Sequence, residues 1–160
     1  MTFNFHNRLR EGFGAMLKVG PIDAIRANWS ESNARSVAKQ FQRKRLHDAN
    51  DYAVEAVRHC AWNFDMTKKI GAQQAKSIAD FRETVDEHFE GRDCVSHFKY
   101  TPLNSMNFHN NHVGRWLGQS PSYRNLSTLE ACERAFDENR LMTAPDLRPG
   151  GSDGNPRTPW

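Results

Sequence analysis

His59 is the residue of this chain best suited to acid–base or nucleophilic chemistry, because the ordinary pKa of an imidazole lies near neutral pH. In a helix that turns by about 100° per residue, His59 falls opposite the apolar stripe, on the same side as Glu55 and Asn63. Trp62 flanks that side, so the second face of this helix is a candidate for lining a cleft. The alternative is a half-exposed amphipathic helix in which His59 only bonds Glu55 one turn earlier.

Two acidic residues on the following predicted helix are placed to serve an imidazole. Asp80 and Glu83 are three residues apart and share a helix face. Carboxylates at this spacing can jointly orient a histidine or bind a cation. Alternatively, the face is solvated and Lys76 pairs with Asp80 one turn later, as is usual on a helix surface. The pattern alone favours this solvated face.

A later predicted helix carries polar residues where helix propensity does not favour them. Asn110 lies on its apolar stripe, and a buried carboxamide needs hydrogen-bond partners. Asn111 and Arg115 are one turn apart on a neighbouring face, and Gly114 allows another helix to approach closely. Adjacent asparagines are unfavourable in a helix interior, and such violations of local rules tend to mark function. We therefore expect one polar site that gathers residues of three helices: Arg58, His59, Asp80, Glu83, Asn110, Asn111 and Arg115.

Helical periodicity dominates the chain, and the alternating pattern of strands is almost missing. Helices are predicted at residues 3–18, 22–46, 48–70, 72–89, 104–118 and 127–142, with a connection at 91–102. Gly20-Pro21 and Gly71 are helix-end signals, and Ser127 with Glu130 forms a capping box. The second predicted helix carries the apolar residues Ile25, Trp29, Val37 and Phe41. The prediction is an all-α single domain at residues 1–144, a bundle of five or six helices around the third, with a flexible Pro/Gly-rich tail at 145–160.

The composition excludes several classes of protein. Of 160 residues, 38% are hydrophobic and 26% are charged, which suits one domain with its own core. No apolar run approaches the roughly 18 residues that span a bilayer, and the first residues do not resemble a Sec signal peptide. The net charge of +3 suits anionic partners such as phosphate groups. The one basic cluster, residues 42–45, is too short to predict a nucleic-acid partner.

Neither a disulfide framework nor a metal site is indicated. Reduced thiols are expected at the three widely spaced cysteines, Cys60, Cys94 and Cys132. The spacing of His88, Cys94 and His97 matches no standard zinc-ligand pattern. The run at residues 109–112 superficially resembles an HNH nuclease, but the β-hairpin that such a motif needs is not predicted before it.

Three sequence blocks follow one another in a fixed order. The first block is EAVRHCAWN at residues 55–63, and the last is MNFHNNHVGR at residues 106–115. Between them lie Gly71, Ala75, Lys76, Asp80 and Glu83. Together these blocks resemble a bacterial toxin domain found at the C-termini of Rhs-type and other polymorphic toxins. The last block is also similar to a segment of Wnt proteins, which relates the pattern to the all-helical lipocone superfamily. The resemblance covers about residues 50–117.

The chain departs from the toxin pattern at three positions. Glu55 and Asn107 each stand where the family has aspartate, and Arg82 stands where it has histidine. The Arg82 departure matters most, because it removes a possible second catalytic base or metal ligand.

The resemblance implies hydrolysis of a phosphate-containing lipid or lipid-linked head group, such as a phospholipid or a polyprenyl-linked peptidoglycan precursor. His59 would act as base or nucleophile, a carboxylate would orient it, and two arginines would clamp the phosphate. The catalytic residues would be His59, Asp80, Glu83 and Arg115. The substrate-binding residues would be Arg58, Asn110, Asn111, Glu55 and Asn63. No cofactor is required, although Asp80, Glu83 and Asn111 could hold a divalent cation.

A toxin of this kind is expected to be cytoplasmic in its producer, with an immunity protein as partner. A secretion apparatus would deliver it to the target-cell periplasm or inner membrane. The first predicted helix combines basic and aromatic residues, which suits peripheral contact with a membrane: Phe3, Phe5, Arg8, Arg10, Phe13 and Lys18. The alternative is that its apolar face packs on the core. Two alternatives remain open, a metal-dependent nuclease toxin and a non-catalytic Wnt-like module that binds a lipid or a partner.

Overall fold

The computed structural model describes residues 19–47, 49–87 and 102–144. Within these ranges it contains helices and no strand, in the order α2 (Pro21–Lys44), α3 (Asp51–Ile70), α4 (Ala72–Glu87), α5 (Pro102–Gln119) and α6 (Thr128–Asp137). The all-α fold predicted from the helical periodicity is therefore confirmed. The predicted helix at 3–18, the tail at 145–160 and nearly all of the connection at 91–102 lie outside the described residues.

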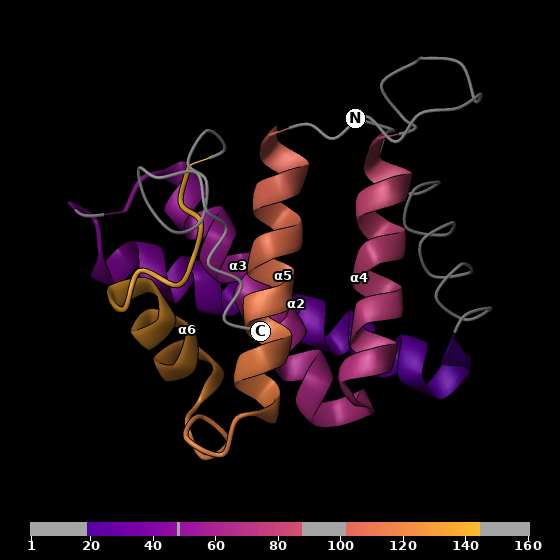
Figure 1. Cartoon of the computed structure of the whole chain (residues 1–160). Helices are drawn as coiled ribbons and strands as arrows, with labels where there is room; N and C mark the ends of the chain where they lie inside the picture. The colour runs from indigo at the N-terminus through magenta and orange to yellow at the C-terminus, as the bar shows by residue number, and fades with distance from the viewer. Residues whose placement is uncertain (1–18, 48, 88–101, 145–160) are drawn as a thin grey trace, which may run out of the picture.

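Helix α3 lies at the centre of the bundle. It contacts each of α2, α4, α5 and α6, and Figure 1 shows α4 and α5 side by side in front of α2 and α3. Apolar residues such as Val57 and Phe64 are buried on α3, and so are the polar residues His59 and Asn63. The prediction that this helix lies at the centre of the bundle is confirmed.

Local signals in the sequence fix most of the helix ends. Asn50 caps α3, where its side chain accepts a 2.8 Å hydrogen bond from the backbone N–H of Ala53. Gly71 ends α3 with a φ of 87°, a backbone conformation that side chains disfavour. At the start of α6, Ser127 and Glu130 form the predicted capping box, in which each side chain bonds the backbone N–H of the other.

Helix α6 is shorter than predicted and ends at Asp137 rather than near residue 142. Asn139 adopts a φ of 54°, which the short polar side chain of asparagine tolerates. Its N–H bonds the carbonyl of Phe136 at 3.0 Å, and the N–H of Arg140 bonds that of Ala135 at 2.9 Å. This pair of bonds is a Schellman motif, with asparagine in the position where glycine is more usual.

Helices α3 and α5 approach each other closely through two glycines one turn apart. A Cβ atom on Gly114 would lie 2.3 Å from the carbonyl oxygen of Cys60. A Cβ atom on Gly118 would lie 2.8 Å from the Cβ and Cγ2 atoms of Thr67. The close approach predicted for Gly114 is therefore confirmed, and it brings the polar residues of α5 up to those of α3.

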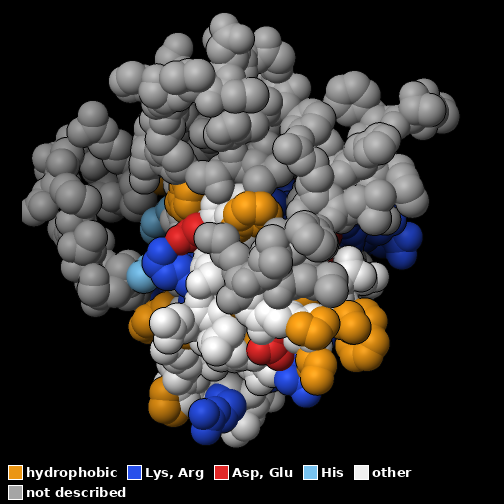
Figure 2. Space-filling view, turned by 90° about the vertical axis from the view of Figure 1, so that its right-hand side faces the viewer, with side chains coloured by type: hydrophobic (Ala, Val, Ile, Leu, Met, Phe, Trp, Pro, Cys, Tyr) orange, Lys and Arg blue, Asp and Glu red, His pale blue; other side chains and the backbone are white. Residues whose placement is uncertain are grey.

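Only some of the apolar residues of α2 are buried. Val37 and Phe41 are buried, but Ile25 and Trp29 are 53% and 62% exposed. At about 100° per residue, Trp29 lies about 80° from Val37 around the helix, so these residues do not share one face. Hydrophobic side chains accordingly appear on the surface in Figure 2. Within the part of the chain that the structure describes, no helix is long and apolar enough to cross a membrane.

Candidate active site

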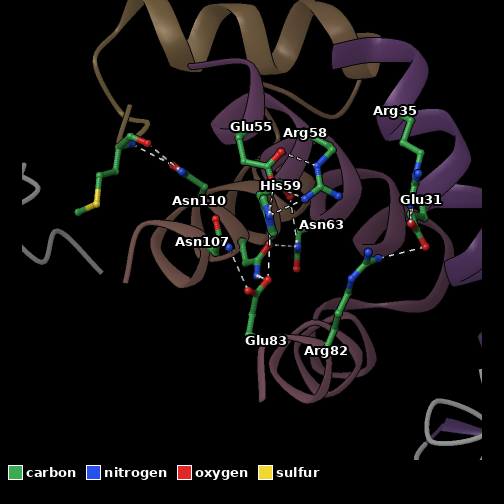
Figure 3. A network of polar contacts seen from close by, with 12 residues as sticks. Glu31, Arg35, Glu55, Arg58, His59, Asn63, Arg82, Glu83, Asn107 and Asn110 are labelled. Atoms are coloured by element: carbon green, nitrogen blue, oxygen red, sulfur yellow. Dashed lines mark hydrogen bonds and ion pairs between the residues drawn. The ribbon is translucent and has the colours of Figure 1, made fainter. Parts of the chain in front are cut away.

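The imidazole of His59 is only 3% exposed and lies between polar side chains from three helices (Figure 3). Its Nδ1 atom is 3.0 Å from Oδ1 of Asn111 on α5 and 3.3 Å from Oε1 of Glu83 on α4. Its Nε2 atom is 3.0 Å from the guanidinium of Arg58 and 3.1 Å from Oε1 of Glu55, both on α3. We call these five residues, with Asn63, Asn107 and Arg115, the His59 cluster.

Glu83 is the buried carboxylate of the His59 cluster, with 4% of its surface exposed. Its Oε1 accepts a 3.1 Å hydrogen bond from Asn111, and its Oε2 accepts one of 3.1 Å from Asn107. These donors and the imidazole compensate for the removal of a negative charge from water. The interpretation of this face of α4 as solvated is therefore wrong for Glu83. It is right for Asp80, which pairs with Lys76 as that interpretation expected.

Arg115 joins the cluster through asparagines rather than by touching His59. It is 7% exposed, and its Nη1 donates a 2.9 Å hydrogen bond to Oδ1 of Asn63. Asn63 in turn donates a 2.7 Å bond to Oδ1 of Asn111. Burial lowers the pKa of the Arg115 guanidinium, and the negative charge of Asp80 partly offsets that effect. Arg115 therefore positions Asn63, and Asn63 in turn holds Asn111 beside the imidazole of His59. Asp80 acts on the cluster through its charge.

Glu55 and Arg58 form the outer, more accessible edge of the His59 cluster. Their side chains are 35% and 23% exposed. The guanidinium of Arg58 bonds both carboxylate oxygens of Glu55, with 2.9 Å from Nε to Oε2. Burial alone would raise the pKa of Glu55, but hydrogen bonds from His59 and Arg58 and their positive charges hold that pKa well below its usual value.

The partners of the imidazole decide where its proton resides. Asn111 donates its amide hydrogen to Glu83 and presents its oxygen to His59, so Nδ1 faces two acceptors and must carry a hydrogen. Nε2 faces a donor, Arg58, and an acceptor, Glu55. It can therefore accept from Arg58 when neutral and donate to Glu55 when protonated. Nε2 thus has a hydrogen-bond partner whether or not it carries a hydrogen.

The low pKa of Glu55 makes stability depend on pH. A carboxyl whose pKa is lower in the folded protein than its unfolded value, here about 4.5, stabilises the fold above that pH. The contribution is lost as the pH falls below that value. We expect the wild-type protein to lose more unfolding free energy between about pH 7 and about pH 3 than Glu55→Gln, which cannot ionise. Urea unfolding at both pH values measures this difference, and equal losses in the two proteins would contradict the low pKa.

The structure does not bring Asn110 into the His59 cluster, which corrects the prediction that it belongs to the polar site. Its amide donates a 2.9 Å hydrogen bond to the carbonyl of Met142 and accepts one of 2.9 Å from the N–H of the same residue. In Figure 3 the side chain of Asn110 points away from His59. Asn110 therefore holds the segment after α6 against α5. The buried carboxamide of Asn110 has polar partners, as predicted, and these partners are the backbone groups of Met142.

Arg82 also points away from the cluster. Its guanidinium is 3.1 Å from a carboxylate oxygen of Glu31 on α2 and lies over the ring of Trp62, 5.0 Å from its centroid. Glu83, the next residue, diverges from Arg82 and points into the cluster (Figure 3). Position 82 thus ties α4 to α2, and a base there would not lie beside His59.

Asn107 is the member of the cluster that sequence reasoning missed as a site residue. It was noted only as a departure from the aspartate of the toxin pattern. It lies one helical turn before Asn111, so the two amides share a face of α5. Each amide donates a hydrogen bond to one carboxylate oxygen of Glu83. The spacing of four residues was a signal that could have identified it.

The described residues include no group of three or more His, Cys, Asp or Glu side chains placed to hold a metal ion. Of the residues considered as cation ligands, Glu83 and Asn111 bond each other, and Asp80 pairs with Lys76. His88, Cys94 and His97 lie outside the described residues.

One family model matches the chain, over residues 15–140, and its description is "Domain of unknown function (DUF6973)". The match includes every described helix and the whole His59 cluster. No curated protein and no solved structure matches the chain significantly. Because the match covers most of the sequence, the chain belongs to the DUF6973 family.

Proposed function

We propose that this protein hydrolyses a phosphoester of a lipid or lipid-linked head group, with His59 as the base or nucleophile. One observation carries the proposal. The imidazole of His59 has a buried carboxylate, Glu83, on its Nδ1 side and a guanidinium, Arg58, on its Nε2 side. A carboxylate behind a histidine fixes its tautomer and stabilises the imidazolium that forms when it acts as a base.

Water attack is the simpler version of the reaction. Nε2 of His59 takes a proton from a water molecule whose oxygen attacks phosphorus. The bond from phosphorus to the leaving oxygen then breaks, and the leaving oxygen takes the proton from Nε2. Glu83 holds the positive charge of the imidazolium between these two transfers.

Arg58 is the residue we assign to the phosphate. The planar guanidinium of Arg58 can donate to two oxygens of one anionic group. In the structure these donors bind the two carboxylate oxygens of Glu55. A phosphate that enters would replace the oxygens of Glu55 on the guanidinium and so lie beside Nε2. Arg115 contributes by positioning Asn63 and Asn111.

The toxin resemblance supports the choice of substrate class. Its first block supplies Glu55, Arg58 and His59, its second supplies Glu83, and its last supplies Asn111 and Arg115. We propose that the protein is an antibacterial effector that acts at the target-cell envelope, on a phospholipid or a polyprenyl-linked peptidoglycan precursor. A cognate immunity protein and a secretion apparatus would be its partners.

Expression in two compartments of a bacterial host tests the envelope as the place of action. We expect the protein to be harmless in the cytoplasm and lytic when a fused Sec signal exports it, because the proposed substrate is reached from the periplasm. The His59→Asn protein, exported to the same level, should not lyse the cells. Equal toxicity from both compartments would contradict the proposal and favour a nuclease.

The burial of His59 favours one other function, a non-catalytic binding module. The side chain is 3% exposed, and both ring nitrogens already have partners in the cluster. In that case the cluster would hold three helices together, and His59 variants would lose stability and not a chemical activity. A variant that keeps its melting temperature and loses its effect separates the two functions.

A further inference from the structure

Two cysteines that the proposed chemistry does not use lie against each other in the core. Cys60 on α3 and Cys132 on α6 are each 0% exposed, and their Sγ atoms are 3.0 Å apart. Both are free thiols in this structure. A disulfide bond is about 2.05 Å long, so about 1 Å of movement would join the two sulfurs.

We propose that Cys60 and Cys132 are a disulfide site, which closes when the chain folds in the presence of a disulfide oxidant. The thiolate of one cysteine attacks the oxidant's disulfide, forms a mixed disulfide and releases one thiol. The thiolate of the other cysteine attacks its partner's Sγ, closes the bond and releases the second thiol. The two protons that the cysteines lose pass to the two released thiolates, so one disulfide is reduced and one is formed.

The burial of both sulfurs sets the time at which the bond can form. Burial raises the pKa of the Cys132 thiol, and its contact with Cys60 raises that pKa further. A buried, protonated thiol reacts slowly, because the thiolate is the reactive species. The exchange therefore takes place during folding, before α6 has packed on α3. The compartment in which the chain folds, and not the one in which it later acts, decides the state of this pair.

The bond would stabilise the centre of the fold. It would join residues 72 positions apart, and cross-links over long loops restrict the unfolded chain most strongly. It would also tie α6 to α3 at the residue that follows His59. This inference does not depend on the chemistry proposed for His59.

Refolding the full chain with glutathione and glutathione disulfide tests the site, in a Cys94→Ala background that leaves only the two cysteines. The refolded protein should be lighter by two hydrogen atoms, give a linked peptide pair that contains Cys60 and Cys132, and melt about 10 °C higher than after reduction. Protein already folded in reductant should react far more slowly in the same buffer. Cys132→Ala should show neither the mass change nor the reductant-dependent shift.

Two results would overturn the proposal. Free thiols after refolding under these conditions would show that the pair cannot close. Oxidation of the folded and the refolding protein at equal rates would show that burial does not control the site.

Discussion

Gly114→Ala is expected to lower the free energy of unfolding by at least about 2 kcal/mol, even though alanine is the better helix former by about 1 kcal/mol. The added Cβ would lie 2.3 Å from the carbonyl oxygen of Cys60 and 2.9 Å from the Cβ atom of Asn63. The oxygen belongs to the backbone of α3, so no side-chain rotation can relieve the clash. Helix α5 must move away from α3, which also pulls Asn111 from His59.

Urea unfolding measures this effect, with His112→Ala as the matched control. His112 is on the exposed side of the same helix, so its replacement creates no buried clash and should lower the unfolding free energy clearly less than Gly114→Ala does. Gly118→Ala should have an intermediate effect, because its closest contacts, at 2.8 Å, are side-chain atoms of Thr67. A Gly114→Ala protein as stable as His112→Ala would contradict the close approach of α3 and α5.

The sequence predicted the helices well where a local signal marks their ends. Gly71 and the capping box of Ser127 and Glu130 mark boundaries by their own backbone chemistry, and both were predicted correctly. The predicted end of α6 was wrong. The residue with left-handed backbone after this helix is Asn139, and asparagine is a weaker helix-end signal than glycine. The exposure of Ile25 and Trp29 on α2 could not be predicted, because apolar side chains do not reveal which helix face has a neighbour.

The candidate site was predictable as far as helix faces could be read. The position of His59 opposite the apolar stripe, and of Asn111 and Arg115 on one face, indicated the meeting of α3 and α5. The partner of Asn110 was not predictable, because it is the backbone of Met142 in an irregular segment. Glu83 and Asp80 were both expected in the site, but the sequence did not show which of the two turns inward, since the packing angle of α4 decides it.

His59→Asn is expected to lower the rate of phosphoester hydrolysis by about a thousandfold, the usual contribution of a general base. The shorter amide can still donate toward Asn111 from about the position of Nδ1, but it has no atom that can take a proton in place of Nε2. His59→Gln should be equally inactive, because its amide nitrogen replaces Nε2 without being basic. Both variants should still fold, with lowered melting temperatures, because buried contacts of the ring with Arg58 and Asn111 are lost or weakened.

His109→Asn serves as the control for the loss of a histidine elsewhere in the bundle. His109 is on α5, and its Nε2 lies 2.8 Å from the carbonyl oxygen of Arg140, outside the His59 cluster. Its replacement should cost some stability, because a half-buried hydrogen bond is lost, and should leave the rate of hydrolysis unchanged.

The most direct test is the release of radiolabelled phosphate groups from two substrates, a phospholipid and a polyprenyl-linked peptidoglycan precursor, with and without EDTA. The wild-type protein and His109→Asn should release label from at least one of them, and His59→Asn should release about a thousandfold less at a temperature at which it is still folded. A rate that EDTA does not reduce would agree with the metal-free version of the reaction. Release by His59→Asn as fast as by the wild-type protein, or none by the wild-type protein from either substrate, would contradict the assignment of His59 as the catalytic residue.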